Sequence, residues 1–177
     1  MSDAPAPAWA QAPLFPFEGE LRVKALQPRA AHDPPRSGEE GGGPCRSCAK
    51  RDDEYLWVSE RWRVAPGGPS VVPMVFLETR AHLDLPDLDE ALAAELGPMI
   101  LRIDRAMTAA LPDVGRVHVH RWGDGAEHFH TWHFARPVGD PQLVGFGLVL
   151  WAQTLPPPPK DEWDATMAAI AAALAAG

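Results

Sequence analysis

Two segments that alternate histidine with apolar residues, separated by a glycine-rich turn, constrain the fold of this chain most strongly. The first reads GRVHVHRW (115–122), the turn reads GDG, and the second reads AEHFHTWHFAR (126–136). A period of two is typical of β-strands, and glycine and aspartate are favoured in the tight turns that join antiparallel strands. The sequence therefore predicts a β-hairpin over residues 115–136.

The predicted hairpin gathers histidines on one face of a sheet. Side chains two residues apart on a strand project from the same face. In the simplest register His120 lies opposite His128, and one face then carries His118, His120, His128 and His130. Trp132 shares this face, and His133 lies on the other one. Opposed side chains are about 5 Å apart at Cβ, which favours a shared ligand or phosphate group over separate half-buried histidines.

The rest of the chain predicts three more strands and two helices. The segments 55–65, 71–78 and 142–153 have strand-like apolar patterns, and Pro73 indicates that the second begins irregularly or lies at a sheet edge. Strands and helices do not alternate in the regular way that builds a parallel sheet. The predicted class is α+β, with an antiparallel sheet of about five strands, a main helix and a C-terminal helix.

The main predicted helix spans residues 86–111. Asp87 is expected to cap it with Glu90 completing a capping box, and Gly97–Pro98 is expected to kink it or to divide it into two abutting helices. Its apolar stripe consists of Leu88, Leu92, Leu96, Met99, Ile103 and Met107. The C-terminal helix has a similar face, expected to pack on the domain or on a partner chain, formed by Trp163, Met167, Ile170 and Leu174.

Length and composition indicate one domain with an irregular extension. The chain has 177 residues and 20 prolines, several of them near its start. We expect a Pro/Gly-rich arm (1–44), a folded domain (45–155) and the C-terminal helix segment (156–177). The net charge of −8 argues against a binder of nucleic-acid backbones, and no segment is apolar enough to span a membrane. The chain start does not resemble a signal peptide, so a cytoplasmic location is expected.

Both cysteines of the chain, Cys45 and Cys48, lie in a C-x-x-C arrangement. In a reducing compartment this spacing indicates a zinc half-site or a redox pair. A redox pair usually opens a helix within a βαβ unit, which the pattern lacks. Zinc needs two further ligands, for which histidine is the natural donor, and His82 is the outlying candidate.

The ordered set of CRSC, a strand that leads to His82, a leucine-rich helix, and a glycine turn before HFH resembles the histidine-triad (HIT) superfamily. That superfamily includes nucleotide hydrolases and galactose-1-phosphate uridylyltransferase. The resemblance covers residues 45–136 and is greatest to the zinc-containing branch related to the uridylyltransferase. It implies a HIT-like sheet, a nucleotide or nucleotide-sugar-like small molecule as ligand, and a homodimer. It also implies a closed structural zinc site formed by Cys45, Cys48, His82 and His128.

The resemblance assigns the chemistry to His130, the second histidine of the motif. Its neutral imidazole would attack the α-phosphorus of a nucleotide ester or amide, giving a covalent nucleotidyl-histidine that water or a second substrate resolves. Turn amides near Gly125, together with His120 and Arg121, would meet the phosphoryl charge. Trp132 would stack on a base or sugar, or would fill the pocket.

The motif departs from both branches of the superfamily. The hydrolases carry His-x-His-x-His, whereas this chain reads HFHTWHF, with Trp132 at the third position and the histidine displaced to His133. The transferases carry a glutamine after His-Pro-His, which is absent here. The resemblance therefore leaves open whether the chain is a hydrolase or a nucleotidyltransferase, and it implies a changed substrate.

Two further functions are consistent with the residues. A non-catalytic nucleotide-binding scaffold would keep the HIT fold and the zinc without turnover. A cupin-like mononuclear metalloenzyme would use His118, His120 and Glu127, although the spacing to Glu127 is longer than in that motif and the second cupin motif is absent.

Overall fold

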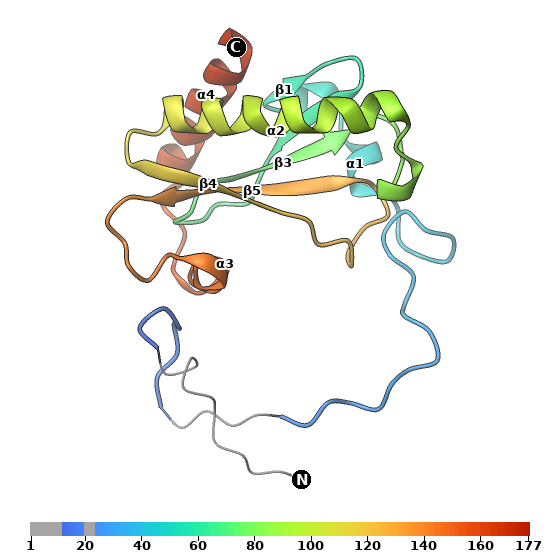
Figure 1. The fold of residues 1–177 in the computed structure, drawn as a ribbon, viewed down its shortest axis with the longest axis horizontal. Coiled ribbons are helices and arrows are strands. Elements are labelled where there is room, and N and C mark those ends of the chain that lie inside the picture. Colours follow the sequence, from blue (N-terminus) through green and yellow to red (C-terminus); the bar gives the residue numbers. More distant parts are fainter. Residues whose placement is uncertain (1–11, 20–23) are drawn as a thin grey trace.

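A computed structural model describes residues 12–19 and 24–177, so residues 1–11 and 20–23 of the expected arm lie outside the described part. Within the described residues, five strands form one antiparallel sheet in the order β1–β2–β3–β5–β4 (Figure 1). The strands are β1 (Trp57–Val58), β2 (Trp62–Pro66), β3 (Met74–Thr79), β4 (Val114–His120) and β5 (His130–Pro137). This sheet, with its helices, confirms the predicted α+β class.

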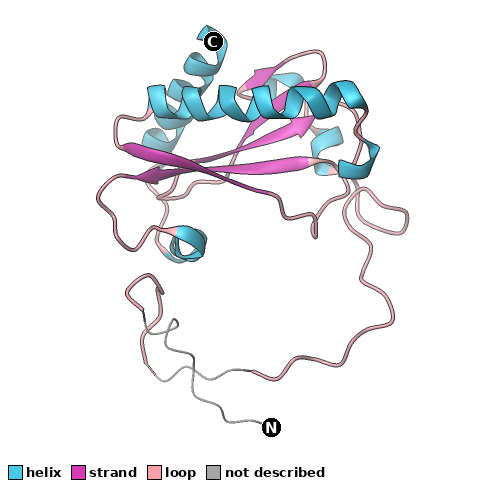
Figure 2. Cartoon of the chain, in the orientation of Figure 1, coloured by secondary structure: helices cyan, strands magenta, loops and turns pink. Residues whose placement is uncertain are grey.

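Helices cover both faces of the sheet to different extents (Figure 2). They are α1 (Arg46–Ala49), α2 (Glu90–Ala110), α3 (Gly145–Thr154) and α4 (Lys160–Ala176), with two 3₁₀ turns, η2 (Asp52–Glu54) and η3 (Leu85–Asp87). The long helix α2 lies along one face beside α4, whereas α3 lies on the opposite side of the sheet (Figure 1). No helix among the described residues has both the length and the apolar character needed to cross a bilayer.

The main core fills the space between the sheet and the pair α2 and α4. Ile103 and Met107 of the predicted stripe are fully buried there, against Val75 and Leu77 of β3. On α4 the four residues of the predicted face, Trp163, Met167, Ile170 and Leu174, are all buried in the same cluster. A period of 3.6 places such residues on one side of a helix, so the sequence pattern identified the buried side of both helices.

The start of α2 differs from the prediction. Asp89, not Asp87, caps the helix by accepting the backbone N–H of Leu92 at 2.7 Å. Asp87 instead belongs to η3, which is capped by Asp84. The helix continues through Pro98 to Ala110, so the alternative of two abutting helices is wrong. An internal proline removes one backbone hydrogen bond, and the buried stripe on both sides of it offsets that loss.

Two of the strand predictions need correction. The segment 55–65 forms two strands rather than one, because a turn at Ser59–Arg61 interrupts it and the Ser59 hydroxyl accepts the backbone N–H of Trp62 at 3.0 Å. The segment 71–78 does begin irregularly, since β3 starts only after Pro73. The alternative of an edge strand is wrong, because β3 lies between β2 and β5.

The segment 142–153, predicted as a buried strand, is largely helical. Residues Gly145–Thr154 form α3, and its Leu148 packs with Leu143, Val72 and Phe134 in a second, smaller core cluster. A short run that is apolar throughout fits a buried strand and a buried helix equally well by its periodicity. In a helix the backbone N–H and C=O groups form hydrogen bonds with one another. A strand at this position would have needed a partner strand at the sheet edge.

The predicted hairpin register is also wrong. His120 pairs with Trp132, and His118 pairs with Phe134, so His128 has no partner on β4. The connection is a nine-residue loop rather than a tight turn, because β5 starts only at His130 and the Phe129 N–H donates to Leu83 O at 2.6 Å. Contacts outside the hairpin thus remove residues 121–129 from the strand ladder.

His133 lies on the sheet face opposite His118, His120 and His130, as predicted, and it is completely buried. Burial lowers its pKa from 6.5 to about 4. The unfolded chain therefore takes up a proton below about pH 6.5 that the folded chain resists until about pH 4. The free energy of unfolding should therefore decrease by about 3 kcal/mol as the pH falls from 6.5 to about 4. Below about pH 4 the protonation of His133 should cause no further decrease.

The measurement is denaturant unfolding of wild type and His133→Leu at pH 7, 5 and 4. We expect the wild type to lose stability relative to the variant as the pH falls, since leucine cannot take up a proton. A difference between the two chains that is constant across pH would contradict the prediction.

Candidate metal centre and the adjoining histidine face

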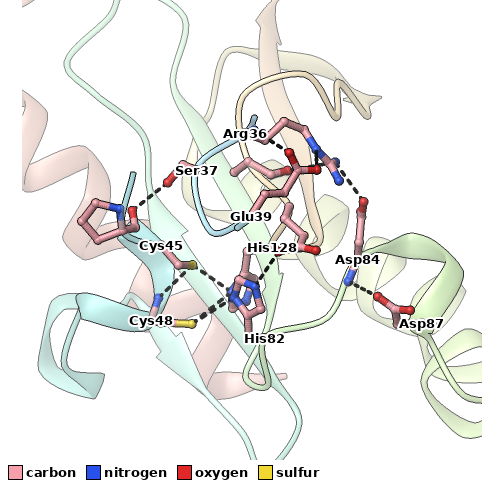
Figure 3. Close-up of polar contacts among 12 residues, drawn as sticks. Arg36, Ser37, Glu39, Cys45, Cys48, His82, Asp84, Asp87 and His128 are labelled. Atoms are coloured by element: carbon pink, nitrogen blue, oxygen red, sulfur yellow. Dashed lines mark hydrogen bonds and ion pairs between the residues drawn. The ribbon is translucent and has the colours of Figure 1, made fainter. Parts of the chain in front are cut away.

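Three separate segments bring two cysteines and two histidines together (Figure 3). Cys45 caps the short helix α1, and its Sγ accepts the backbone N–H of Cys48 at 3.4 Å. His82 follows β3, and His128 lies in the loop before β5. One ligand atom from each of the four residues lies within 4.8 Å of all the others. The fold therefore brings together the four residues that the resemblance assigned to a metal.

The distances within the cluster fit a tetrahedral metal ion. His128 Nδ1 lies 3.4 Å from Cys45 Sγ and 3.5 Å from Cys48 Sγ, and His82 Nδ1 lies 3.3 Å from Cys48 Sγ. An ion with metal–sulfur and metal–nitrogen distances of about 2.3 and 2.0 Å separates these ligand atoms by roughly 3.6 Å. The donor set of two sulfurs and two imidazole nitrogens is thus spaced for such an ion without a large rearrangement.

The outer nitrogens of both imidazoles have acceptors. His128 Nε2 lies 2.7 Å from the carbonyl oxygen of Thr79, and His82 Nε2 lies 3.1 Å from Glu127 Oε2. A neutral imidazole that donates from Nε2 carries its free lone pair on Nδ1. Both lone pairs therefore point toward the cysteine sulfurs, as metal coordination through Nδ1 requires.

The two thiols differ in their tendency to ionise. Burial raises the pKa of Cys45, but hydrogen bonding, led by the backbone N–H and the side chain of Cys48, outweighs burial and lowers that pKa below its usual value. Burial, with the hydrogen bond and charge of Cys45, raises the pKa of Cys48 to about 11. The negative charge of one thiolate thus disfavours ionisation of the second thiol beside it. A bound cation would offset this repulsion, because metals bind cysteine as the thiolate.

An ion-pair network holds the arm beside this cluster (Figure 3). The Asp84 carboxylate accepts from Arg36 Nη1 at 2.9 Å and from Arg121 Nη2 at 2.7 Å. Arg36 Nη1 also donates to the carbonyl oxygen of Gly123 at 3.0 Å. Burial raises the pKa of Asp84, but the N–H of Leu85 and the Arg36 guanidinium lower it overall. Asp84 therefore remains ionised and ties the arm to the loop before β5.

Backbone contacts extend this attachment toward the metal ligands. The Ser37 N–H donates to Gly125 O at 3.2 Å, and the Glu127 N–H donates to Ser37 O at 3.0 Å. The next residue, Gly38, has a φ of +98°, and a Cβ there would lie 2.7 Å from His82 Cε1. A side chain at Gly38 would thus strain the backbone and press on the ring of His82, a candidate metal ligand.

His130 is the first residue of β5, and it is half-buried. Its Nδ1 lies 2.9 Å from the carbonyl oxygen of His128, which fixes the ring and leaves Nε2 as the nitrogen with the free lone pair. Because His128 belongs to the cysteine–histidine cluster, a single carbonyl links the candidate nucleophile to the candidate metal centre. The ring also lies edge-on to Phe76, with centroids 6.4 Å apart.

Aromatic rings line the sheet face beside His130. They belong to Phe76, His118, His120, Trp122, Trp132 and Phe134. His120 stacks on Trp122 with centroids 4.9 Å apart, and Trp122 lies edge-on to Trp132 at 5.4 Å. Burial and the nearby His120 lower the pKa of His118. Three of the four histidines predicted to share a face, those at 118, 120 and 130, thus do so, whereas His128 turns toward the cysteines.

The residues expected to bind substrate surround His130 in different ways. His120 and Trp132 lie on the aromatic face, and in the described part of the chain His120 Nε2 and Trp132 Nε1 are buried without a hydrogen-bond partner. Gly125 lies on the exposed loop. Arg121 is occupied by its ion pair with Asp84. The partnership of Asp84 with Arg36 had no sequence signal, because the two are 48 residues apart and form no motif.

The cupin-like arrangement is not formed. Glu127 contacts His82 instead of meeting His118 and His120, whose rings face aromatic neighbours. Across residues 12–19 and 24–177, the Cys45–Cys48–His82–His128 set is the one group of three or more cysteine, histidine or acidic side chains placed to hold a metal ion. The hairpin register therefore does not produce the metal site of His118, His120 and Glu127 that the cupin-like spacing suggested.

The five-stranded antiparallel sheet and its helices form a known fold. Solved histidine triad proteins share it, including one from Marinobacter aquaeolei VT8 (21% identity, TM-score 0.56, covering 68% of this chain and 86% of that one). Another is from Bradyrhizobium japonicum (20% identity, TM-score 0.56, covering 68% and 89%). A third is a Zn-bound histidine triad family protein from Mycobacterium smegmatis (17% identity, TM-score 0.50, covering 69% and 86%).

At these identities the likeness establishes the fold alone. The sequence itself matches no family model and no curated protein. The chain therefore has the fold of histidine triad proteins, and its function has to be argued from its own residues.

Proposed function

We propose that this chain is a HIT-like nucleotide-phosphate hydrolase or nucleotidyltransferase that acts through a covalent nucleotidyl-His130 intermediate. The observation that carries the proposal is the 2.9 Å contact between His130 Nδ1 and His128 O, which orients the ring and leaves Nε2 free of that hydrogen bond. An oriented, neutral imidazole is a competent nucleophile toward phosphorus. The fold shared with solved histidine triad proteins, one described as nucleotide-binding, supports a nucleotide-like substrate.

In the proposed reaction, Nε2 of His130 forms a bond to the α-phosphorus, and the leaving group departs with the electrons of its own bond to that atom. Water or an acceptor hydroxyl then attacks the same phosphorus, loses its proton, and releases His130. Loop amides near Gly125 and the His120 ring would stabilise charge on the phosphoryl oxygens. Trp132 would contact the base or sugar, and Arg121 would act on phosphate only after leaving Asp84.

We assign the cysteine–histidine cluster to a structural zinc ion, which would supply a cross-link between the arm and the loop before β5. Two thiolates and two imidazoles form a closed tetrahedral set without a position for water. The spacing of the four ligand atoms and the Zn-bound relative from Mycobacterium smegmatis support this choice. Fixing His128 would also fix the carbonyl that orients His130. We further propose the domain limits given above, a cytoplasmic location and a homodimer.

A second candidate, a nucleotide-binding scaffold without turnover, is favoured by one observation. The third position of the motif is Trp132, whose half-buried ring packs on Phe76 at 4.5 Å, where the hydrolases carry a histidine. In this case ligand would bind on the same face without forming an adduct.

Intact mass spectrometry distinguishes the two candidates. The zinc-loaded chain is mixed with nucleoside 5′-phosphoramidates, nucleotide-sugars and dinucleotides, and is then quenched at alkaline pH, where phosphohistidine-type bonds persist. We expect a nucleotidyl mass increment on the intact chain, located to the peptide that contains His130 by subsequent digestion, and the substrate that gives the increment identifies the substrate class. Binding without an increment and without product would support the scaffold instead.

A further inference from the structure

We propose that Glu127 is a positioning residue of the metal centre, which orients His82 for coordination through Nδ1. This inference rests on the metal site of the proposed function. The two histidines of the cluster are held very differently. His128 is 1% exposed and bonded to a backbone carbonyl, whereas the His82 side chain is 35% exposed in a loop. His82 therefore needs another group to hold its ring, and Glu127 is in contact with it.

Glu127 is itself fixed from two sides. Its backbone N–H donates to Ser37 O at 3.0 Å, and it directly precedes the buried His128. Its Oε2 then lies 3.1 Å from His82 Nε2, while Gly38 of the arm approaches the same ring at Cε1. The carboxylate thus reaches His82 from a backbone that cannot shift without disturbing a second ligand.

The contact has a chemical consequence for the metal. A carboxylate that accepts the Nε2 proton keeps the Nδ1 lone pair free and increases the electron density that the ring donates. Nδ1 of His82 lies 3.3 Å from Cys48 Sγ, on the metal side of the ring. Removal of such an outer partner typically weakens metal binding about 10- to 100-fold. Glu127 should therefore control how tightly His82 binds the metal.

The test measures zinc affinity by competition with a chromophoric chelator, using the full chain. We expect Glu127→Ala to weaken binding about 10-fold or more. Glu127→Gln should fall between this variant and the wild type, because its amide oxygen accepts the same hydrogen bond without the charge. Asp124→Ala is the matched control, since Asp124 is an exposed carboxylate on the same loop.

Cobalt substitution provides a second measurement that a general loss of structure would not mimic. The visible ligand-field bands of the cobalt form should shift in Glu127→Ala, be restored in Glu127→Gln, and stay unchanged in Asp124→Ala. Equal affinity and equal spectra for Glu127→Ala and Asp124→Ala would overturn the role of Glu127 while leaving the metal centre intact. A wild type that binds neither zinc nor cobalt would overturn the proposed metal centre itself.

Discussion

Removing zinc from the zinc-loaded chain is expected to lower the apparent free energy of unfolding by about 4 kcal/mol. This value applies to a free zinc concentration about 1,000 times the dissociation constant of the site. A chain of this size should then unfold roughly 10 °C lower. The reason is that the four ligands Cys45, Cys48, His82 and His128 come from three segments, so a metal that binds only the folded arrangement stabilises it by its binding free energy. Thermal unfolding with and without a chelator measures the effect.

In the metal-free folded chain, the loss of ordered structure should be confined to the segments around the ligands. The main core beneath α2 and α4 contains none of the four ligands, so it should persist without metal. Hydrogen exchange should therefore lose protection in residues 36–50 and 121–129 and retain it in α2. Cys48→Ser should behave like the chelated wild type and should not respond further to chelator. Unchanged melting and unchanged exchange after chelation would contradict a structural metal.

Replacing His130 by alanine is expected to abolish the adduct and to reduce turnover at least about 10³-fold, because effects of this size follow from removing a catalytic nucleophile. The variant should fold normally, since His130 is only half-buried at the start of β5. The measurement is turnover of the substrate that labels the wild type. His32→Ala is the matched control, because that histidine lies exposed in the arm.

Chemical rescue separates a nucleophile from a structural histidine. Imidazole added to His130→Gly should restore part of the turnover, since the free base can occupy the space left by the side chain and attack the same phosphorus. The wild type should show no such gain. If His130→Ala and His32→Ala turn over equally fast, His130 is not the nucleophile.

The prediction succeeded where neighbouring residues carry the information. The face on α4 and four residues of the predicted stripe on α2 follow from helical periodicity and are buried as expected, whereas Leu96 is only partly buried and Leu88 lies before the helix. The C-x-x-C spacing, interpreted as one half of a metal site, does bring both sulfurs into the same Cys45–Cys48–His82–His128 cluster. In each case the chain geometry within one or two turns dictates which side chains meet.

The prediction failed where distant contacts compete with local pattern. The sequence predicts two strand ends joined by a tight turn over residues 121–129, but Ser37, Leu83 and the cysteine cluster contact these residues, and the β4–β5 register differs from the predicted one. The apolar segment 142–153 is a helix because it packs on Val72 and Phe134 rather than pairing as a strand. Asp84 binds two arginines that are distant in the sequence: Arg121 is 37 residues away and Arg36 is 48 residues away. No local motif indicates either partner.

The sequence by itself determined the α+β class, the buried sides of the helices, and the residue types available for a metal and a nucleophile. The resemblance had already grouped His128 with the cysteines. The tertiary structure alone decided that His128 leaves the strand ladder, that its carbonyl contacts His130 Nδ1, and that Glu127 contacts His82. The periodicity of apolar residues determines which side chains project from the same face of one helix or strand. The position of one element against another depends on contacts between residues far apart in the chain, whose partners a single sequence does not specify.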